Sequence, residues 1–419
     1  MTELAIFLSK SLLGWLVIQV LLALVFLWNL RSSRKNSLPD NELPKTAVIL
    51  CLRGADPFLA NCLRSLFNQN YPNYDLKLIV DSQEDAAWKI ATDTILEEGA
   101  TNVEISPLRI MRHNCSLKCS SIVQAISELD DSHKVIALVD ADTIVHPNWL
   151  RELVIPLTNP NVGATTGNRW YVPTGKYWGS LVRYIGNTSS VVQMYLFRIP
   201  WGGTLAVKAD LLYQTGLLNT WAQAFSDDFT ICKAIKQQGM QIKFVPSLIM
   251  LNQEECDLPS LITNLQRLIL CARFYNPSWM AIVSEAISSI LFPTVLLMLF
   301  LTALLTVQWE IAALIFAFYC SYTAGLLLVM LALEQGVKQV IRFYNEPTTE
   351  LSTGIIIKMS IAIPLTQWVY GWAMLSSLWI QTVKWRGVTY RVTGPWNINL
   401  VEYRPFELLE KTGDRKLSL

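Results

Sequence analysis

The sequence lacks an excess of charge of either sign, a cysteine framework, internal repeats and low-complexity segments. A formal net charge of +1 over 419 residues gives no global attraction to nucleic acid. The eight cysteines are scattered, and their spacing matches neither a disulfide framework nor a zinc ribbon, so we interpret them as reduced thiols in a cytosolic domain. His113, Cys115 and Cys119 lie close together, but no second ligand cluster follows, and a metal site there is not favoured.

Apolar residues, by contrast, are abundant. They make up 52% of the chain and give a mean hydropathy of +0.32, which is too apolar for an ordinary soluble protein. Ser11–Leu30 is a nearly unbroken apolar run, long enough as a helix to cross a hydrocarbon core of ~30 Å and too long for a cleaved signal peptide. Arg31, Arg34 and Lys35 follow directly, so the positive-inside rule predicts that the next part of the chain is cytosolic.

After a linker at residues 36–44, the composition becomes that of an α/β domain. Predicted strands alternate with predicted helices, which indicates a mostly parallel, doubly wound sheet. Ligands of such sheets bind beyond the carboxyl ends of the strands, where we expect Asp81 and Asp140. In chain order the predicted elements are the strand Ala47–Leu52, the helix Pro57–Asn68, the strand Leu76–Val80, the helix Ala86–Glu98, the helix Cys119–Leu129 and the strand Val135–Val139.

The C-terminal third returns to membrane composition. Met280–Val307 and Ile311–Leu333 predict a hairpin of two spanning helices, Gly336–Thr353 an interfacial segment, and Ile355–Val383, interrupted by Pro364, a third apolar run. We therefore divide the chain into an N-terminal transmembrane anchor (residues 1–35), an α/β domain (45–277), transmembrane and interfacial helices (278–383) and a basic tail (384–419).

Two arguments disagree about the side of the membrane on which the tail lies. Three C-terminal crossings would put the tail outside, whereas its seven basic residues favour the cytosol. A break at Pro364 that turns the last run into a re-entrant or surface helix would resolve the conflict, and we favour a cytosolic tail.

Two acidic pairs carry the predicted chemistry. Asp140 and Asp142 follow an apolar strand, and the alternation of extended chain puts both carboxylates on one side. Neighbouring carboxylates repel unless a cation lies between them, and hard divalent cations bound to diphosphates use such sites. Asp227 and Asp228 precede a predicted helix, Phe229–Gln238. One acid can raise the pKa of the next, as a general base requires, although Asp227 could instead cap the helix.

Five further residues are candidates for donor binding, each with a simpler alternative. Asp81 could accept hydrogen bonds from a base or ribose, or only cap a turn. Lys118, near a helix start, could bind phosphate, or be a solvated lysine. Gly203, before a strand, could let substrate approach the backbone, or form a tight turn. Arg267 and Arg273 do not share a helix face; one could clamp a diphosphate, while the other snorkels or binds lipid headgroups.

In order and spacing, these residues resemble the family 2 glycosyltransferases with a GT-A fold. The similarity is greatest to the membrane-embedded branch that includes ceramide glucosyltransferases and, further off, hyaluronan and cellulose synthases, and it extends from about residue 11 to residue 390. It is carried by the segments Leu52–Pro57, Gln69–Pro72, Asp81, Asp140–Asp142, Trp201–Thr204 and Ser226–Asp228, and Trp385–Arg391 resembles the end of bacterial chains of that branch.

The resemblance implies an inverting transfer of a hexose, with glucose as the leading candidate, from a UDP-sugar to a membrane lipid hydroxyl. Asp81 would then bind the uridine, Asp140 and Asp142 would hold Mg²⁺ or Mn²⁺ on the diphosphate, and Asp228 would be the base. The expected protein is a multi-pass membrane enzyme with a cytosolic catalytic domain.

Alternatives to a lipid acceptor remain. The family motif of Gln or Arg, two residues and then Arg-Trp is matched here only by Arg267, and the missing tryptophan argues against a processive polysaccharide synthase. A polyprenyl-phosphate glycosyltransferase also stays open. A transporter or inactive scaffold is less favoured, because repeated halves are absent and Glu285 and Lys358 lie near span ends. The aromatic segment Tyr171–Ile199 could rest on the bilayer or be an ordinary core helix.

Overall fold

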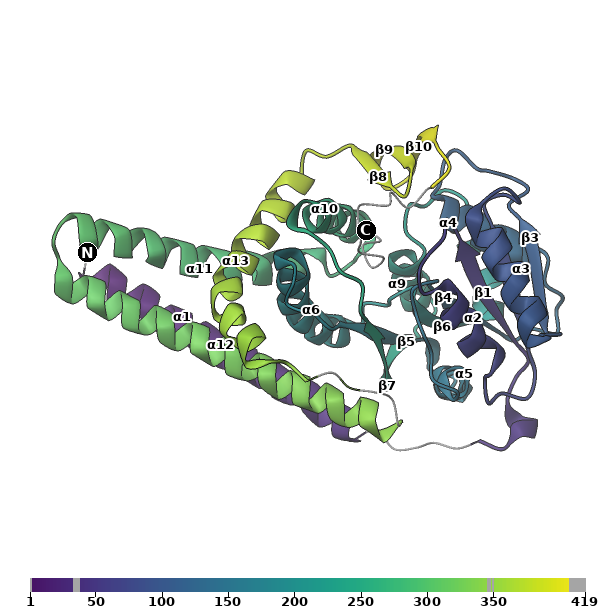
Figure 1. Cartoon of the computed structure of the whole chain (residues 1–419), viewed down its shortest axis with the longest axis horizontal. Helices are drawn as coiled ribbons and strands as arrows, with labels where there is room; N and C mark the ends of the chain where they lie inside the picture. Colours follow the sequence, from purple (N-terminus) through teal and green to yellow (C-terminus); the bar gives the residue numbers. More distant parts are fainter. Residues whose placement is uncertain (1, 33–37, 345–347, 349, 407–419) are drawn as a thin grey trace.

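The computed structural model describes residues 2–32, 38–344, 348 and 350–406. An α/β unit lies at one end of the molecule, and a long arm of the helices α1 (Thr2–Ser32), α11 (Trp279–Leu305) and α12 (Trp309–Phe343) extends from it (Figure 1). Several basic residues used in the topology argument lie outside the described part of the chain: Arg34, Lys35, Lys411, Arg415 and Lys416.

The α/β unit is built on a mixed seven-stranded sheet of order β3-β2-β1-β4-β6-β5-β7. The α/β class is as predicted, but the sheet is not parallel throughout, because β6 runs antiparallel to both β4 and β5. The strands are β1 (Thr46–Leu52), β2 (Tyr74–Val80), β3 (Val103–Pro107), β4 (Val135–Val139), β5 (Val162–Tyr171), β6 (Thr204–Lys208) and β7 (Gln241–Asn252).

Helices cover both faces of this sheet, so its central strands are apolar on both sides. Along β1, Val48 and Leu50 join one core while Ala47 and Ile49 join the other. The covering helices are α2 (Leu59–Phe67), α3 (Ala86–Glu98), α4 (Leu117–Ser127), α5 (Trp149–Val154), α7 (Ala209–Gln214), α8 (Leu217–Trp221) and α9 (Asp228–Gln237), with short 3₁₀ turns η1 (Asp40–Glu42) and η2 (Ile155–Thr158).

Local signals account for the helix ends at the ligand-binding edge. The Asp85 side chain caps α3 by accepting from the amide of Ala87, and Gly99, at φ 61°, ends it in the left-handed conformation. The Ser116 hydroxyl caps α4 by accepting from the amide of Cys119. The Asp85 carboxylate also accepts from the amide of Gly54, so this cap ties the loop after β1 to the loop after β2.

Three helices among the described residues are long and apolar enough to cross a membrane: Thr2–Arg31, Trp279–Leu305 and Trp309–Phe343. They indicate association with a membrane. The expected interfacial segment Gly336–Thr353 begins as helix, because α12 continues to Phe343, and its position at the interface stays a prediction. Gly336 lets α1 approach α12 closely, since a Cβ there would overlap the Leu27 side chain. Glu334 further ties α12 to the α/β unit by accepting from Trp170 Nε1 at 2.7 Å and Tyr184 OH at 2.9 Å.

Three more helices connect the arm to the α/β unit: α6 (Trp178–Phe197), α10 (Leu258–Tyr275) and α13 (Thr353–Ser377). α13 holds Pro364 inside it and is not one of the three spanning candidates among the described residues. Tyr184 of α6 is fully buried, which favours a core helix over one that rests on a bilayer.

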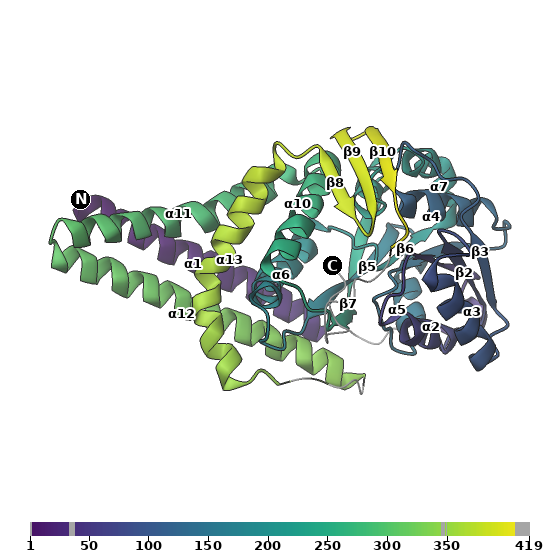
Figure 2. The same cartoon turned by 45° about the horizontal axis from the view of Figure 1, so that its top comes forward.

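Part of the expected basic tail folds into a second sheet. The strands β8 (Thr382–Trp385), β9 (Val388–Gly394) and β10 (Asn397–Tyr403) form an antiparallel sheet beside the α/β unit (Figure 2). Arg386 and Gly387, at φ 42° and 76°, make the tight turn between β8 and β9. Val388, Tyr390 and Val392 alternate into the core that also contains α4 and α9.

Gly179→Ala should lower stability. A Cβ at this position in α6 would overlap the backbone carbonyl group of Asp257, which cannot move as a side-chain tip can. We expect a loss of about 2 kcal/mol or more, measured as a lower melting temperature of the purified protein in detergent. Gly354→Ala is the control, because nothing but the Ser352 hydroxyl lies within 4 Å of its Cβ position. Equal melting temperatures for the two variants would contradict the predicted overlap.

Candidate active site

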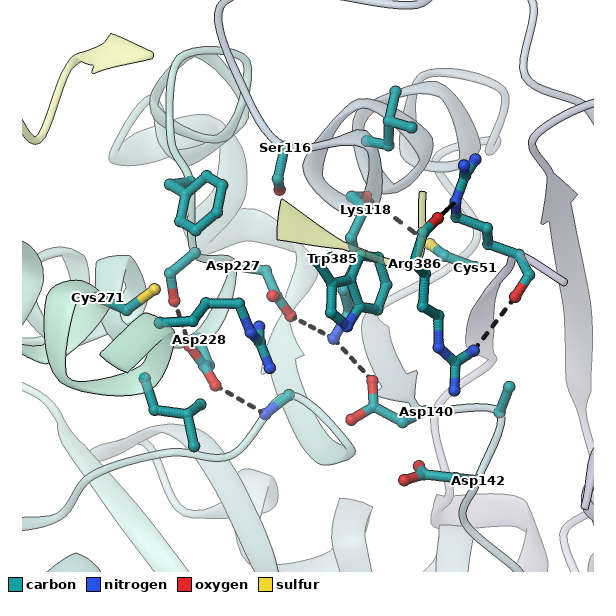
Figure 3. Close-up of a pocket in the computed structure, with 18 of the residues that line it drawn as sticks. Cys51, Ser116, Lys118, Asp140, Asp142, Asp227, Asp228, Cys271, Trp385 and Arg386 are labelled. Carbon is teal, nitrogen blue, oxygen red and sulfur yellow. Dashed lines mark hydrogen bonds and ion pairs between the residues drawn. The ribbon is translucent and has the colours of Figure 1, made fainter. Parts of the chain in front are cut away.

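Most predicted site residues line one cavity of about 210 Å³ at the carboxyl ends of β1, β2 and β4 (Figure 3). The pairing of neighbouring strands brings together the residues that follow them. Leu52 at the end of β1 pairs with Val80 at the end of β2, and Leu50 of β1 pairs with Val139 at the end of β4. The cavity includes Asp81, Lys118, Asp140, Asp142, Asp227, Asp228 and Arg267. Gly203 and Arg273 do not line it.

Lys118 lies between the two acidic pairs. Its ammonium is 2.8 Å from Asp140 Oδ1 and 3.1 Å from Asp227 Oδ2, so it is an ion-paired group and not a solvated lysine. Burial opposes charge on Asp140, but Lys118 and Arg169 outweigh it and lower the pKa of that carboxyl. Burial, with the added repulsion of Asp228, raises the pKa of Asp227 to about 6 despite Lys118.

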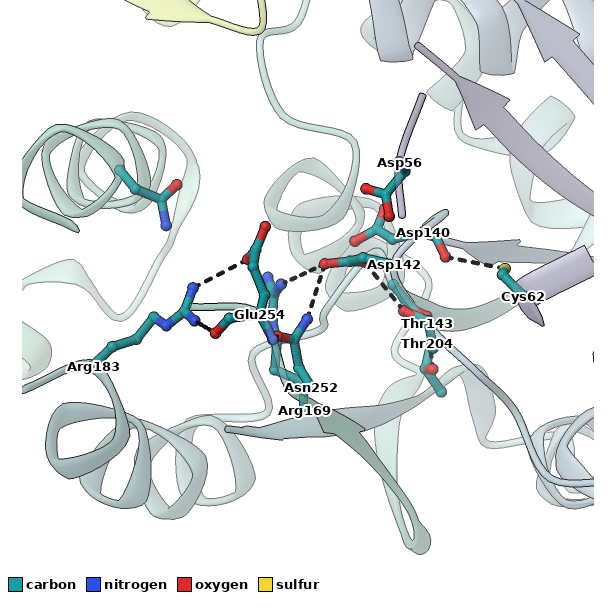
Figure 4. Close-up of polar contacts among 12 residues, drawn as sticks. Asp56, Cys62, Asp140, Asp142, Thr143, Arg169, Arg183, Thr204, Asn252 and Glu254 are labelled. Carbon is teal, nitrogen blue, oxygen red and sulfur yellow. Dashed lines mark hydrogen bonds and ion pairs between the residues drawn. The ribbon is translucent and has the colours of Figure 1, made fainter. Parts of the chain in front are cut away.

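Asp142 lies in a separate polar network (Figure 4). Its Oδ2 accepts from Asn252 Nδ2 at 3.1 Å and lies 3.5 Å from Arg169 Nη1. Burial raises the pKa of Asp142, and the nearby carboxylates of Asp140 and Asp56 raise it further, against the effect of Arg169. Asp140 and Asp142 therefore bring two carboxylates close together on one side of the cavity, and each has a basic partner, Lys118 and Arg169 respectively.

Asp81 is paired with Arg53, which follows β1 as Asp81 follows β2. Both side chains are buried, and burial raises the pKa of Asp81 to about 6 even with the guanidinium beside it. Arg53 also donates to the backbone carbonyls of Arg386 and Arg404, so the C-terminal sheet holds the pair in place.

Asp228 begins α9, where its carboxylate accepts three hydrogen bonds. The amide of Phe229 donates to Oδ1 at 2.8 Å, the amide of Gly202 to Oδ2 at 3.3 Å, and the Ser226 hydroxyl also to Oδ1. The alternative role of Asp227 as a helix cap is not seen, because its side chain makes no capping hydrogen bond.

The two residues outside the cavity have other functions. Arg273 donates to the carbonyls of Ser377 and Leu378 at 3.1 and 3.2 Å, so it stabilises the end of α13 and does not line the cavity. Gly203 precedes β6, whose antiparallel pairing of Thr204 with Val139 brings the glycine next to Asp140. What approaches this backbone is the Trp201 ring and the Asp140 carboxylate, not an open substrate space.

Sequence reasoning did not assign roles to four other residues of this cavity: Arg53, Arg169, Trp385 and Arg386. Arg386 Nη2 pairs with Asp56 Oδ2 at 2.8 Å, and Trp385 lies under Arg267, whose guanidinium carbon is 5.8 Å from the ring centroid. In the same sheet, Tyr390 OH accepts from the amide of Leu117, directly before Lys118. The turn at Arg386-Gly387 between alternating apolar residues is the one sequence signal that could have found this sheet.

A second, mostly apolar cavity of about 370 Å³ adjoins the first. The residues that line both cavities are Arg169, Tyr171, Trp201, Asp228, Phe229, Asn264 and Leu268. The remaining walls of the second cavity come from α1, α6, α10, α11, α12 and α13, which include the three candidate membrane helices. The first cavity, a charged cleft, therefore meets the second cavity, an apolar chamber, at Asp228.

A mixed α/β sheet with paired acids at its carboxyl edge is the arrangement of a GT-A glycosyltransferase. The chain belongs to glycosyl transferase family 21, whose family model matches residues 12–396. It is a sugar-transferring enzyme of this fold. The family that matches is family 21, whereas the sequence motifs resembled family 2.

The fold agrees with that of a solved structure. The mannosyltransferase PcManGT from Pyrobaculum calidifontis, in complex with GDP-Man and Mn²⁺, matches with a TM-score of 0.50 and 14% identity over 89% of this chain and 99% of that chain. Glucosyl-3-phosphoglycerate synthase from Mycobacterium tuberculosis, in complex with Mn²⁺, UDP-glucose and phosphoglyceric acid, matches with a TM-score of 0.38 and 13% identity over 57% of this chain and 85% of that chain.

Gly203→Ala should reduce activity without unfolding the protein. The added methyl group would overlap Trp201 and lie 2.7 Å from Asp140 Oδ2, so the carboxylate must shift. A shift of this size in a catalytic cleft costs on the order of 100-fold in turnover. Sugar-transfer rates report the loss, with Gly354→Ala as the control. Wild-type rates for Gly203→Ala would show that Asp140 tolerates displacement.

Proposed function

We propose that this protein transfers a hexose, with glucose as the first candidate, from a UDP-sugar to a hydroxyl group of a membrane lipid. The single observation that supports this most is the meeting of the two cavities. Asp228 lines both the charged cleft and the apolar chamber between the candidate membrane helices. A hydroxyl presented from a lipid in that chamber would reach the carboxylate without passing through water.

In this proposal the charged cleft binds the donor. Asp81, held by Arg53, accepts hydrogen bonds from the uridine. Lys118, Arg267 and Arg386 supply positive charge for the diphosphate, which they can neutralise as it leaves. Arg273 and Gly203, predicted from sequence for the same purpose, are not part of this donor site.

Asp140 and Asp142 would hold a divalent cation, Mg²⁺ or Mn²⁺. The fit rests on the oxygen donors present, because the carboxylates of Asp56, Asp140 and Asp142 lie close together, and burial with the added effect of Asp140 and Asp56 raises the pKa of Asp142. Among the described residues, no group of three or more His, Cys, Asp or Glu side chains could hold a metal alone, so the diphosphate would complete the ligand set. When bound, the cation supplies charge neutralisation of the diphosphate.

Asp228 would accept the proton of the lipid hydroxyl as that oxygen attacks the anomeric carbon. The three hydrogen bonds to its carboxylate fix the orientation that this transfer requires. A single displacement of this kind inverts the anomeric centre. Asp227 stays paired with Lys118 and positions the ammonium.

We also propose that the α/β unit is cytosolic and that the chain crosses the membrane three times, through α1, α11 and α12. The β8–β10 sheet contacts the α/β unit through Arg53 and Tyr390, so both lie on one side of the membrane. Three crossings satisfy this contact, with α13 remaining on the cytosolic side. The conflict between crossing number and basic residues then disappears.

The apolar walls of the second cavity favour a lipid acceptor over the growing polysaccharide of a processive synthase, which needs a polar channel. A polyprenyl phosphate remains the alternative lipid acceptor, and it belongs in the acceptor panel of the assay below.

Asp228→Asn should abolish transfer while leaving UDP binding unchanged. The amide cannot take the hydroxyl proton, and general-base loss lowers rates on the order of 10²- to 10⁴-fold. Purified protein, a panel of UDP-sugars and a membrane lipid extract with added polyprenyl phosphate test this by mass spectrometry of the products. Asp210→Asn, an exposed acid at the start of α7, is the control. No glycolipid from the wild-type protein with any donor would refute the proposed function.

Asp140→Asn and Asp142→Asn should weaken metal-dependent binding of UDP. Each removes one carboxylate oxygen donor from the proposed cation site, and we expect affinity to fall on the order of 10- to 100-fold. Calorimetric titration with UDP, with Mn²⁺ and with EDTA, measures the effect. Asp131→Asn, on the surface before β4, is the control. If both variants bind UDP with wild-type affinity and EDTA does not change that affinity, a metal role for these acids is excluded.

A further inference from the structure

A third cavity, of about 530 Å³, lies where two of the candidate membrane helices meet the α/β unit. Its walls come from the C-terminal ends of α1 and α12, from α5 and η2, and from the first half of β7 (Figure 1). Among the described residues, it shares no lining residue with the charged cleft or with the apolar chamber. Its volume is that of a small-molecule site, for which ~300–1,000 Å³ is usual.

In the proposed membrane topology, this cavity lies at the depth of the lipid headgroups. The apolar run of α1 ends at Leu30, and that of α12 ends at Leu333. The cavity is lined by Leu30 and Arg31 of α1 and by residues of α12 from Gly336 onward. Both helices therefore line it with the part that directly follows their hydrocarbon-spanning length. Trp28, one turn before Arg31, is 78% exposed, as is usual for a ring at the membrane–water interface.

Basic side chains dominate the charge of the cavity. Three of its lining residues are basic, Arg31, Arg151 and Lys243, and one is acidic, Glu152. Arg151 is already engaged, because its guanidinium pairs with Asp40 and donates to two backbone carbonyls. Arg31 and Lys243 are exposed, and neither forms an ion pair or a side-chain hydrogen bond with the described part of the chain. Two cations are therefore available to a ligand.

The other lining residues indicate an anion that carries an apolar part. Glu152 accepts a hydrogen bond from the Tyr344 hydroxyl, so it does not serve as the counter-ion of Arg31 or Lys243. Uncharged polar side chains add neutral hydrogen-bonding groups, and apolar side chains complete the walls. The polar ones are Asn148, Ser247 and Gln339, and the apolar ones include Ile155, Phe244, Val340 and Phe343.

We propose that this cavity binds the phosphate of an anionic phospholipid of the cytosolic leaflet, with Arg31 and Lys243 as its cationic contacts. That leaflet carries the negative surface charge that attracts basic residues next to a spanning helix. The inference rests on the proposed topology and does not depend on the sugar or on the acceptor. Because Arg31 belongs to α1 and Lys243 to β7, the bound phosphate ties the helical arm to the α/β unit.

The test counts the lipid bound to the full-length protein, purified in neutral detergent, by native mass spectrometry. Dioleoyl phosphatidylglycerol is the anionic probe, and dioleoyl phosphatidylcholine, with the same chains, is the zwitterionic one. The wild type should retain the anionic lipid in preference. Arg31→Gln with Lys243→Gln removes both cationic contacts, and affinity for phosphatidylglycerol should fall on the order of 10- to 100-fold. Inorganic phosphate at the same concentration should not displace the lipid, because it lacks the chains that the apolar walls contact.

The matched control is Lys10→Gln with Lys89→Gln, which removes the same charge from exposed lysines of α1 and α3 outside the cavity and should keep wild-type affinity. The melting temperature of each variant in lipid-free detergent reports its folding. Equal retention of the two lipids by the wild type, or equal affinity for phosphatidylglycerol in the two double variants, would overturn the inference. Displacement by inorganic phosphate would also overturn it and assign the cavity to a soluble anion. None of these measurements requires sugar transfer, so a protein that makes no glycolipid but retains phosphatidylglycerol as expected would count against the proposed function alone.

Discussion

The structure depends on holding several buried carboxylates in one cleft without letting their repulsion open it. Five of the predicted acids line that cleft, and cations from distant parts of the chain compensate them. Lys118 from α4 joins Asp140 to Asp227, Arg169 from β5 approaches Asp142, and Arg53 pairs with Asp81. Breaking a buried pair leaves a charge uncompensated, which costs far more than a surface pair contributes. The folded chain is therefore constrained to keep these segments together.

That constraint explains why the C-terminal sheet returns to the α/β unit. The carbonyls of Arg386 and Arg404 accept from Arg53, and the Arg386 guanidinium pairs with the buried Asp56. The chain runs from the cleft through the membrane-level helices and back before it supplies these groups. Donor cleft and helical arm are thus linked by the covalent path as well as by packing.

The sequence predicted the elements whose signals are local. α3 and β4 have the bounds expected from their patterns, because the Asp85 cap and Gly99 limit the helix and polar residues limit the strand. Four acids could be identified as site candidates from the sequence, because adjacent carboxylates need a cation or a proton wherever they lie. They are Asp140, Asp142, Asp227 and Asp228.

What could not be predicted depends on contacts between remote segments. The pairing of Arg53 with Asp81 follows from the register of β1 with β2, and that register depends on how the two buried strands pack and not on a local sequence signal. Arg273 and Arg267 looked equivalent in the sequence, because the distinction arises only from α13, whose last carbonyls accept from Arg273. The antiparallel insertion of β6, which turns Gly203 toward Asp140, is likewise a property of the whole sheet.

At the junction of the two cavities, Asp228 has to meet two opposite requirements. In the proposed reaction, the charged cleft needs polar neighbours that compensate a diphosphate, whereas the apolar chamber excludes water from an attacking hydroxyl. Asp228 lies at the junction because α9 begins there, with Gly202 on the side of the cleft and Phe229 lining both spaces. Two backbone amides and the Ser226 hydroxyl donate to its carboxylate and hold its orientation at the junction. In the proposed reaction, these donors fix the direction from which the carboxylate meets the acceptor hydroxyl.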